Sequence, residues 1–221
     1  MPIAKLIARA ILSFSFLAIP AVAEPAESQE PHRKVIKKKV GRATLFDDLR
    51  AGGYVLLMRH ANSPSGQENP VALSDNCILA EGRGLDTEGM LQARLIHDFL
   101  VGEAIAVAKS YSSDRCRTVD TAMLVAPGAA WSVAKALAIP EESHALDFQK
   151  YVSTLLDEEG GNVLLVSHSN IVPFYGATTE GGEEEVPSGV LYIIDPENWS
   201  QIARLDVDTE LKVKMKIRAK H

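Results

Sequence analysis

The chain has few cysteines and lacks a long hydrophobic run beyond its N-terminus. Its 221 residues include two cysteines, Cys77 and Cys116, which excludes a disulfide-rich scaffold and allows one internal bridge. No apolar stretch after residue 23 reaches the roughly 20 residues that cross a bilayer. Charged residues make up 24% of the chain and hydrophobic residues 46%, as in an ordinary globular protein rather than a disordered one.

The first 23 residues form a separate segment. Lys5 and Arg9 precede an apolar stretch at residues 10–19, and Ala21-Val22-Ala23 supplies an A-x-A cleavage site, the pattern of a secretory signal peptide. The sequence therefore predicts a signal peptide at 1–23, a polar basic tether at 24–42, and one domain at 43–221 with a basic C-terminal strand or tail. We expect a periplasmic or secreted protein, in which a disulfide can form.

Charge is distributed unevenly along the chain. Acidic side chains outnumber basic ones by more than two to one between residues 44 and 211, whereas residues 33–42 and 212–220 are basic. Residues 211–217 alternate apolar and basic side chains, which predicts an edge strand whose lysines prevent edge-to-edge association. Weak contact of the basic tails with anionic surfaces is an alternative. We expect no nucleic-acid partner, because aromatic residues do not interleave these tails.

Predicted strands alternate with predicted helices. Apolar runs at residues 54–58, 105–111 and 162–166 are typical of strands buried on both faces. Periodic patterns predict helices at 43–51, 87–100, 115–125 and 144–158, and further strands at 190–194, 202–207 and 211–217. We interpret Gly52-Gly53 as a turn, 64–84 as a long loop and 126–142 as irregular or partly helical. This order predicts an α/β three-layer sandwich with a mostly parallel central sheet flanked by helices.

Polar side chains follow three of these strands at their carboxyl ends. They are Arg59-His60, residues 112–117 and His168. Carboxyl ends of neighbouring parallel strands meet in one crevice, so these side chains should lie together. Arginine offers a charged fork of donors for phosphate, and histidine is a nucleophile or proton carrier near neutral pH. The sequence thus predicts a phosphate pocket that contains a nucleophile.

Four segments in order resemble motifs of the histidine phosphatase superfamily. Arg59-His60-Ala61 resembles its RHG signature, and residues 85–93 (LDTEGMLQA) its L-S/T-x-x-G-x-x-Q-A helix start. Residues 112–122 (SSDRCRTVDTA) are similar to its SSP-x-x-RA-x-x-TA segment, and residues 162–171 (NVLLVSHSNI) to the strand with the second histidine. The resemblance implies a phosphoglycerate mutase-like fold and phosphomonoester hydrolysis without a metal or other cofactor. With the signal peptide, it is nearest to small exported bacterial phosphatases, whose substrates are phosphorylated small molecules or glycans, including envelope sugars.

The resemblance also implies roles for individual residues. His60 would attack phosphorus and form a phosphohistidine, which water then hydrolyses. Arg59, Arg117 and His168 would hold the non-bridging oxygens. The nucleophile must be a neutral imidazole, so a backbone acceptor should bind its other N–H. Ser63 matches a small hydroxyl position that supports substrate binding, and Arg115 falls at a variable position as a cation on the rim.

Some positions depart from the family pattern, above all the proton donor. Ala61 replaces glycine, and Asp114 stands where proline is common. One branch places an acid directly after the second histidine, but Ser169 occupies that position here. Another branch uses a glutamate in the interval that holds Glu141, Glu142 and Asp147. Of these, we favour Glu141 or Glu142 as the proton donor.

Two other functions fit parts of the sequence. Cys77 and Arg83 have the C-x5-R spacing of cysteine-dependent phosphatases, although polar residues precede the cysteine and Gly84 follows the arginine. The lack of a clear acid also suits a phosphoryl-binding module with little turnover. A disulfide between Cys77 and Cys116 would hold the long loop beside the pocket. In the chain-entropy model, closing this loop would stabilise the fold by about 3–4 kcal/mol.

Overall fold

The computed structural model describes residues 42–64, 83–181, 183–207 and 213–217. All of them belong to one compact unit, which spans Lys39–His221. The predicted signal peptide and tether lie outside the described residues. Within the described part, none of the helices is both long and apolar enough to cross a membrane.

A seven-stranded sheet forms the centre of this unit, in the order β3-β2-β4-β1-β5-β6-β7. Neighbours from β3 to β1 are parallel, whereas β5, β6 and β7 are antiparallel to their neighbours. The predicted α/β sandwich is confirmed, and the sheet is parallel in the part that carries the predicted site. The strands are β1 (Gly52–Arg59), β2 (Val107–Ser112), β3 (Ala130–Val133), β4 (Gly161–Ser167), β5 (Leu191–Asp195), β6 (Ser200–Val207) and β7 (Val213–Ile217).

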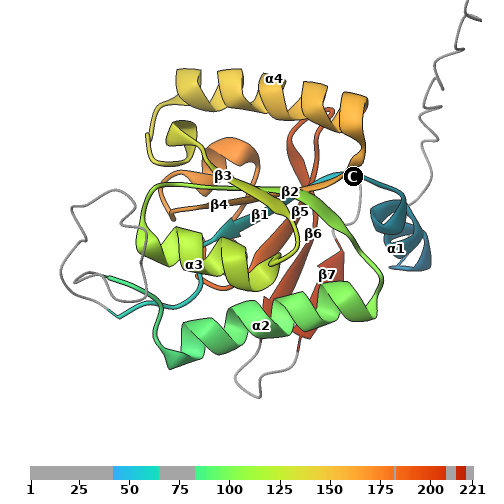
Figure 1. Ribbon diagram of the computed structural model, residues 1–221. Helices are drawn as coiled ribbons and strands as arrows, with labels where there is room; N and C mark the ends of the chain where they lie inside the picture. Colours follow the sequence, from blue (N-terminus) through green and yellow to red (C-terminus); the bar gives the residue numbers. More distant parts are fainter. Residues whose placement is uncertain (1–41, 65–82, 182, 208–212, 218–221) are drawn as a thin grey trace, which may run out of the picture. The chain divides into compact units, whose positions relative to one another are not determined.

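Helices cover both faces of the sheet, which gives the three layers. In Figure 1, α2 and α3 lie on one side of the sheet and α4 lies on the other. The four helices are α1 (Arg42–Ala51), α2 (Thr87–Gly102), α3 (Cys116–Val125) and α4 (Glu142–Glu159). Two short 3-10 turns, η1 (Lys135–Leu137) and η2 (Val172–Tyr175), complete the described elements.

β1 and β4 are buried on both faces, as their continuous apolar runs predict, whereas the first half of β2 is exposed or half-buried. Leu56 and Met58 of β1 pack into the core on the α2 and α3 side of the sheet. Val55 and Leu57 point the other way, into the core under α4. All four side chains are fully buried. Because neither face of β1 meets water, a one-residue slip in register would still bury apolar groups but would misplace Arg59.

Gly52 and Gly53 are the first two residues of β1 rather than a turn before it. Gly52 has φ +86° and pairs with Gly161, the first residue of β4. A Cβ on Gly52 would lie 2.6 Å from the Cα of Gly161, so these two backbones approach more closely than any side chain allows. The predicted turn at 52–53 is therefore wrong, because the glycines serve strand pairing.

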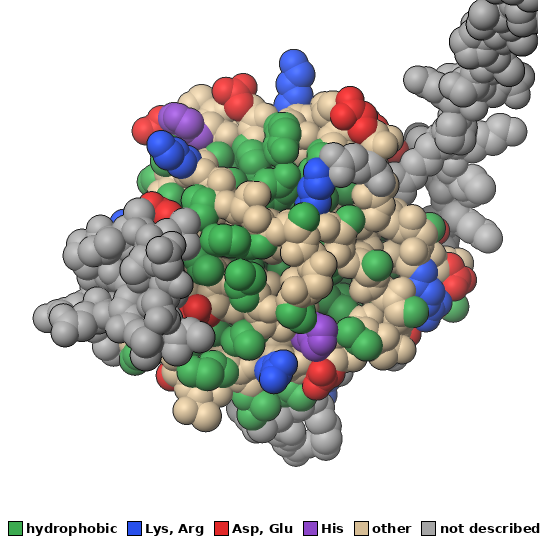
Figure 2. All heavy atoms as spheres, in the orientation of Figure 1, with side chains coloured by type: hydrophobic (Ala, Val, Ile, Leu, Met, Phe, Trp, Pro, Cys, Tyr) green, Lys and Arg blue, Asp and Glu red, His purple; other side chains and the backbone are tan. Residues whose placement is uncertain are grey.

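Sequence patterns missed β3 but found the opposite edge of the sheet. β3 is a four-residue strand in the segment interpreted as irregular, and its side chains are exposed or half-buried, so it has no apolar signature. β7 forms the other edge, as its alternation predicts, and Lys216 pairs with Asp206 at 3.1 Å. Hydrophobic side chains are interspersed with polar ones on the face shown in Figure 2. The large hydrophobic side chains that are exposed belong to three different helices: Met90, Leu91, Val101, Met123, Leu146 and Tyr151.

Candidate active site

Three adjacent strands bring the predicted residues to one edge of the sheet. Arg59 is in register with Ser167, and Ser112 is in register with Val166. The chain stays paired one step further, because the His60 amide donates to the Ser167 carbonyl at 3.0 Å. His60, Ser113 and His168 therefore follow β1, β2 and β4 at neighbouring positions. The predicted convergence of these strand ends is confirmed.

His60 is held as a neutral imidazole with a defined tautomer. Its Nδ1 lies 2.8 Å from the carbonyl oxygen of Ala61, and because a carbonyl only accepts, Nδ1 carries the proton. Nε2 consequently keeps its lone pair. The side chain is 4% exposed, and this burial, aided by the charges of Arg117, Arg59 and Arg83, lowers the pKa of His60 from 6.5 to about 3. The predicted backbone acceptor for the second N–H is confirmed.

The loop after His60 is fixed by a threonine on α3. The Ala61 amide donates to Thr121 Oγ1 at 3.0 Å, and that hydroxyl donates to the Arg117 carbonyl at 2.7 Å. All three groups are buried. The threonine of the third motif thus links the loop after His60 to the helix turn that carries Arg117.

The start of α2 packs against the same loop. Asp86 caps this helix by accepting from the Gly89 amide at 2.7 Å, and its second oxygen accepts from Asn62 Nδ2 at 2.8 Å. The backbone amide of Asn62 donates to Gln92 Oε1 at 2.9 Å. The approach is so close that a Cβ on Gly89 would lie 2.0 Å from the Asn62 carbonyl oxygen. The glycine and glutamine of the second motif therefore position the loop after His60 (residues 61–63), the proposed nucleophile loop.

His168 lies beside His60 and is also neutral. The two ring centroids are 5.7 Å apart. Arg117 donates to His168 Nδ1 at 3.3 Å, so the proton of the neutral ring is on Nε2, which donates to Ser113 Oγ at 2.9 Å. Burial, followed by the charge of Arg117, lowers the pKa of His168 to about 3. Ser113 in turn bonds Thr118 at 2.7 Å, which makes Ser113 a positioning residue that the motifs did not single out.

In the described part of the chain, the guanidinium of Arg59 is hydrogen-bonded through NH1, whereas its Nε is not. Its NH1 donates to the Glu185 carboxylate at 2.6 Å and to the Val186 carbonyl at 2.8 Å. Its Nε is buried and has no hydrogen-bond partner among the described residues. Nε is therefore a donor that a bound phosphoryl oxygen could satisfy.

Two further arginines contribute positive charge. Arg83 donates from Nε to Ser63 Oγ at 2.7 Å, and its charge helps to lower the pKa of His60. From the sequence, Arg83 was considered only for its C-x5-R spacing from Cys77, so its proximity to His60 was missed. Arg115 lies 3.8 Å from Asp114 and its charge acts on His168, which agrees with a cation on the rim.

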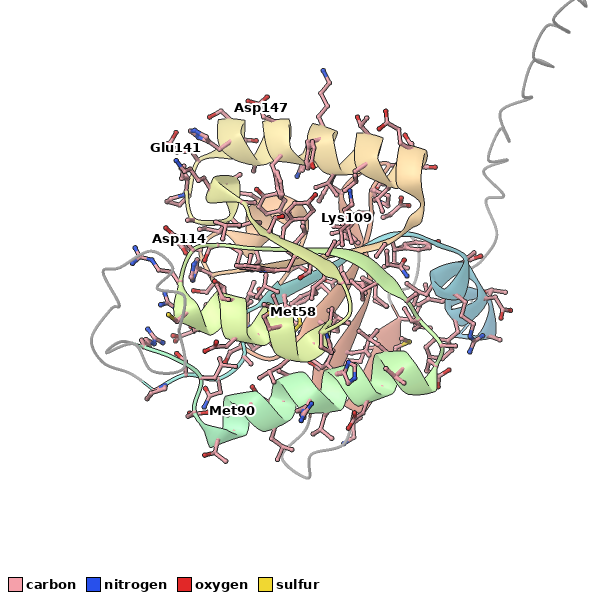
Figure 3. All side chains as sticks on the ribbon, viewed as in Figure 1. Met58, Met90, Lys109, Asp114, Glu141 and Asp147 are labelled. Carbon is pink, nitrogen blue, oxygen red and sulfur yellow. The ribbon has the colours of Figure 1, made fainter. Side chains whose placement is uncertain are left out.

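The favoured proton donors have other contacts. Glu141 lies at the start of α4 (Figure 3), where its carboxylate is 63% exposed and 3.2 Å from His144. Glu142 is exposed in the first turn of the same helix. Within the described part of the chain, no contact joins either one to His60. The acid that does reach the pocket is Glu185, which was missed because it lies in a run of three glutamates that matches no motif.

Cys116 lies at the start of α3 and is disulfide-bonded. Its predicted partner, Cys77, lies outside the described residues, as does the rest of the long loop up to residue 82. In the resolved ranges, no group of three or more histidine, cysteine or acidic side chains is placed to hold a metal ion.

Residues 55–141 match the family model of the histidine phosphatase superfamily (branch 1). The match covers less than half of the 221 residues. The matched range includes His60, Arg117 and the parts of α2 and α3 that contact the loop after His60. It ends before His168.

Solved structures with a similar arrangement are distant in sequence. The SixA protein of Agrobacterium tumefaciens is 19% identical, with 69% of this chain and 97% of that one covered and a TM-score of 0.48. A protein histidine phosphatase SixA complexed with tungstate is 16% identical over 75% of this chain and 96% of that one, with a TM-score of 0.47. Phosphoglycerate mutase of Thermus thermophilus is 21% identical over 70% and 99%, with a TM-score of 0.43. No curated protein matches the chain in sequence.

Proposed function

We propose that this domain is a phosphomonoesterase that works through a phosphohistidine on His60. One observation supports it above all: a buried, neutral imidazole keeps its Nε2 lone pair in a pocket lined with arginines. A histidine that served only as a cation for phosphate would gain nothing from a pKa lowered to about 3. A nucleophile needs that lone pair.

The proposed reaction has two displacements. Arg59, Arg117 and His168 bind the non-bridging oxygens, and the Nε2 lone pair of His60 forms a bond to phosphorus as the P–O bond to the leaving group breaks. The leaving oxygen takes a proton and departs as an alcohol. Water then attacks the phosphohistidine, loses a proton and releases inorganic phosphate, which restores the neutral imidazole. Ser63 and Arg83 support the pocket from the loop side through their bond at 2.7 Å.

The proposed substrate is a phosphorylated small molecule or glycan encountered outside the cytoplasm. Support for this setting comes from the N-terminal signal pattern and from the disulfide at Cys116. Glu141 and Glu142 stay as proposed donors of the leaving-group proton. Replacing each by glutamine should slow hydrolysis of an alkyl phosphate while sparing 4-nitrophenyl phosphate, whose leaving group needs no proton.

Hydrolysis of 4-nitrophenyl phosphate by purified mature protein tests the proposed function. We expect His60→Ala to lower kcat by about a thousandfold or more, as loss of a covalent nucleophile does. His144→Ala is the matched control, because His144 is an exposed histidine outside the pocket. Cys77→Ser should keep full activity, whereas a cysteine-dependent phosphatase would lose it. Phosphate binding without any turnover by the wild type would indicate a phosphoryl-binding module instead.

A further inference from the structure

Glu185 lies at the pocket without belonging to any motif. Its carboxylate accepts from Arg59 at 2.6 Å and also accepts a hydrogen bond from Ser169, the residue after His168. It is close enough to His60 for the two groups to interact electrostatically. The hydrogen bond from Arg59 is the largest cause that lowers the pKa of Glu185, so the group is a carboxylate at neutral pH. A negative charge therefore sits at the edge of a pocket built for a phosphoryl anion.

Phosphoryl binding does not require Glu185 to leave. Arg59 gives NH1 to Glu185 and to the Val186 carbonyl, while its buried Nε lies on another edge of the guanidinium. An incoming oxygen can bond the Nε edge while NH1 keeps both bonds. The Arg59 side chain is 15% exposed and that of Glu185 is 59% exposed, so the arginine is largely buried and the carboxylate lies on its solvent side. In the complex, the carboxylate would face the group attached to the phosphate.

The fold holds this acidic loop in place from below. Arg204 of β6 is 3% exposed and donates to both oxygens of Glu183, at 3.0 and 3.2 Å. Gln201 of the same strand donates to Glu180 at 3.3 Å. These bonds hold the segment before Glu185 against β6. On the other side of Glu185, the Val186 carbonyl accepts from Arg59 and holds the following residue. The position of the Glu185 charge is therefore set by the fold and not by a freely moving side chain alone.

We propose that Glu185 determines specificity by favouring phosphomonoesters whose leaving group carries a positive charge and disfavouring those with a second anionic group. This inference rests on the proposed function, since it concerns the substrate of the same pocket. The physical reason is the sign of the charge that meets the leaving group at the entrance. An ammonium there gains a partner, and a carboxylate or second phosphate is repelled. Because the charge of Glu185 partly offsets that of Arg59, Arg59 also binds a simple anion less tightly than an unpaired arginine would.

Three phosphates of equal carbon length provide the test: phosphoethanolamine, ethyl phosphate and phosphoglycolate. For the wild type we expect kcat/KM to fall in that order. Glu185→Gln should compress the ratio between the first and last by about two- to fivefold, the range for a partly exposed ion pair. The same variant should bind inorganic phosphate more tightly. Glu184→Gln removes the same charge one residue earlier, from an exposed side chain, and should keep the wild-type order.

The outcomes separate this inference from the proposed function. An unchanged ratio in Glu185→Gln, or an equal change in Glu184→Gln, overturns the role of Glu185 even if hydrolysis is efficient. If no ester is hydrolysed, the proposed function fails, and calorimetric Kd values for the same three compounds decide the inference. A wild-type preference for phosphoethanolamine that Glu185→Gln removes would support it there, and equal Kd values for all three compounds would overturn it.

Discussion

At the scale of single residues, the pocket depends on two histidines that stay neutral next to arginines. His60 and His168 each have a pKa of about 3, with burial as the largest cause. Their hydrogen bonds specify opposite tautomers, with the proton on Nδ1 of His60 and on Nε2 of His168. Neighbouring cations alone would not do this, because their effect is screened by salt, whereas burial persists. His60 therefore stays neutral across the whole neutral pH range, as the proposed nucleophile requires.

This neutrality should make the protein less stable in acid. The folded pKa of His60 lies near 3 and the unfolded value near 6.5, so between these values the unfolded chain binds a proton that the folded chain refuses. Stability is therefore greatest above pH 6.5 and falls as the pH drops toward 3. At pH 5 the loss from His60 alone should be about 2 kcal/mol.

Urea unfolding at pH 7 and pH 5 measures this effect. The drop in unfolding free energy between the two pH values should be smaller in His60→Gln than in the wild type, and unchanged in the exposed control His144→Gln. Equal drops in the wild type and His60→Gln would show that His60 titrates normally in the folded protein.

Some of these residues were predictable from the sequence and others were not. Arg59, His60 and His168 stand at strand ends and Arg117 in the first turn of α3, all in recognisable motifs, and the structure brings them together. Arg83 and Glu185 lie in loops, where no periodicity or motif reports which way a side chain points. Their contacts depend on tertiary packing, which local sequence does not encode.

At the scale of elements, the nucleophile loop is held between α2 and α3. α3 holds it through Thr121, and α2 holds it through Asp86, Gly89 and Gln92. The sequence predicted both helices and their order, because their apolar faces repeat with helical period. The sequence did not reveal that Gly89 packs against the Asn62 backbone, since the two residues are far apart in the chain.

Gly89→Ala should displace the loop that carries His60. Its Cβ would lie 2.0 Å from the Asn62 carbonyl oxygen, so backbone must move. We expect kcat to fall by at least about tenfold, since misplacement of reacting groups by about 1 Å is costly. Gly102→Ala, in the last turn of the same helix, is the control, because nothing lies within 4 Å of its Cβ. Stopped-flow or steady-state assays of both variants measure the difference, and equal activities would contradict the account.

At the scale of the whole molecule, an acidic body surrounds a basic pocket. The chain has a formal net charge of −6, yet Arg59 and Arg117 act on both histidines, Arg83 acts on His60 and Arg115 acts on His168. Such a field repels polyanions in general and admits a phosphoryl group only where the arginines converge. The α/β class followed from the alternation of strands and helices. The antiparallel half of the sheet did not, because connection geometry rather than local pattern decides it.

Export is a prediction about the whole chain that residues 1–23 carry. Expressed from Met1 in a bacterial host with a secretion pathway, the mature protein should begin at Glu24 and be found outside the cytoplasm. N-terminal sequencing of the purified protein checks this. Ala23→Arg should block cleavage, because the site requires a small residue there. A cytoplasmic protein that retains residues 1–23 would contradict the prediction.

The central claim is that the phosphoryl group passes through His60. Mixing the protein with a phosphomonoester, quenching within milliseconds in alkali, where phosphohistidine survives, and mapping the peptides by mass spectrometry tests it directly. We expect a phosphoryl group on the peptide that contains His60, and none there in the His60→Ala variant. Turnover with the phosphoryl group on another residue, or on no residue at any quench time, would contradict the account.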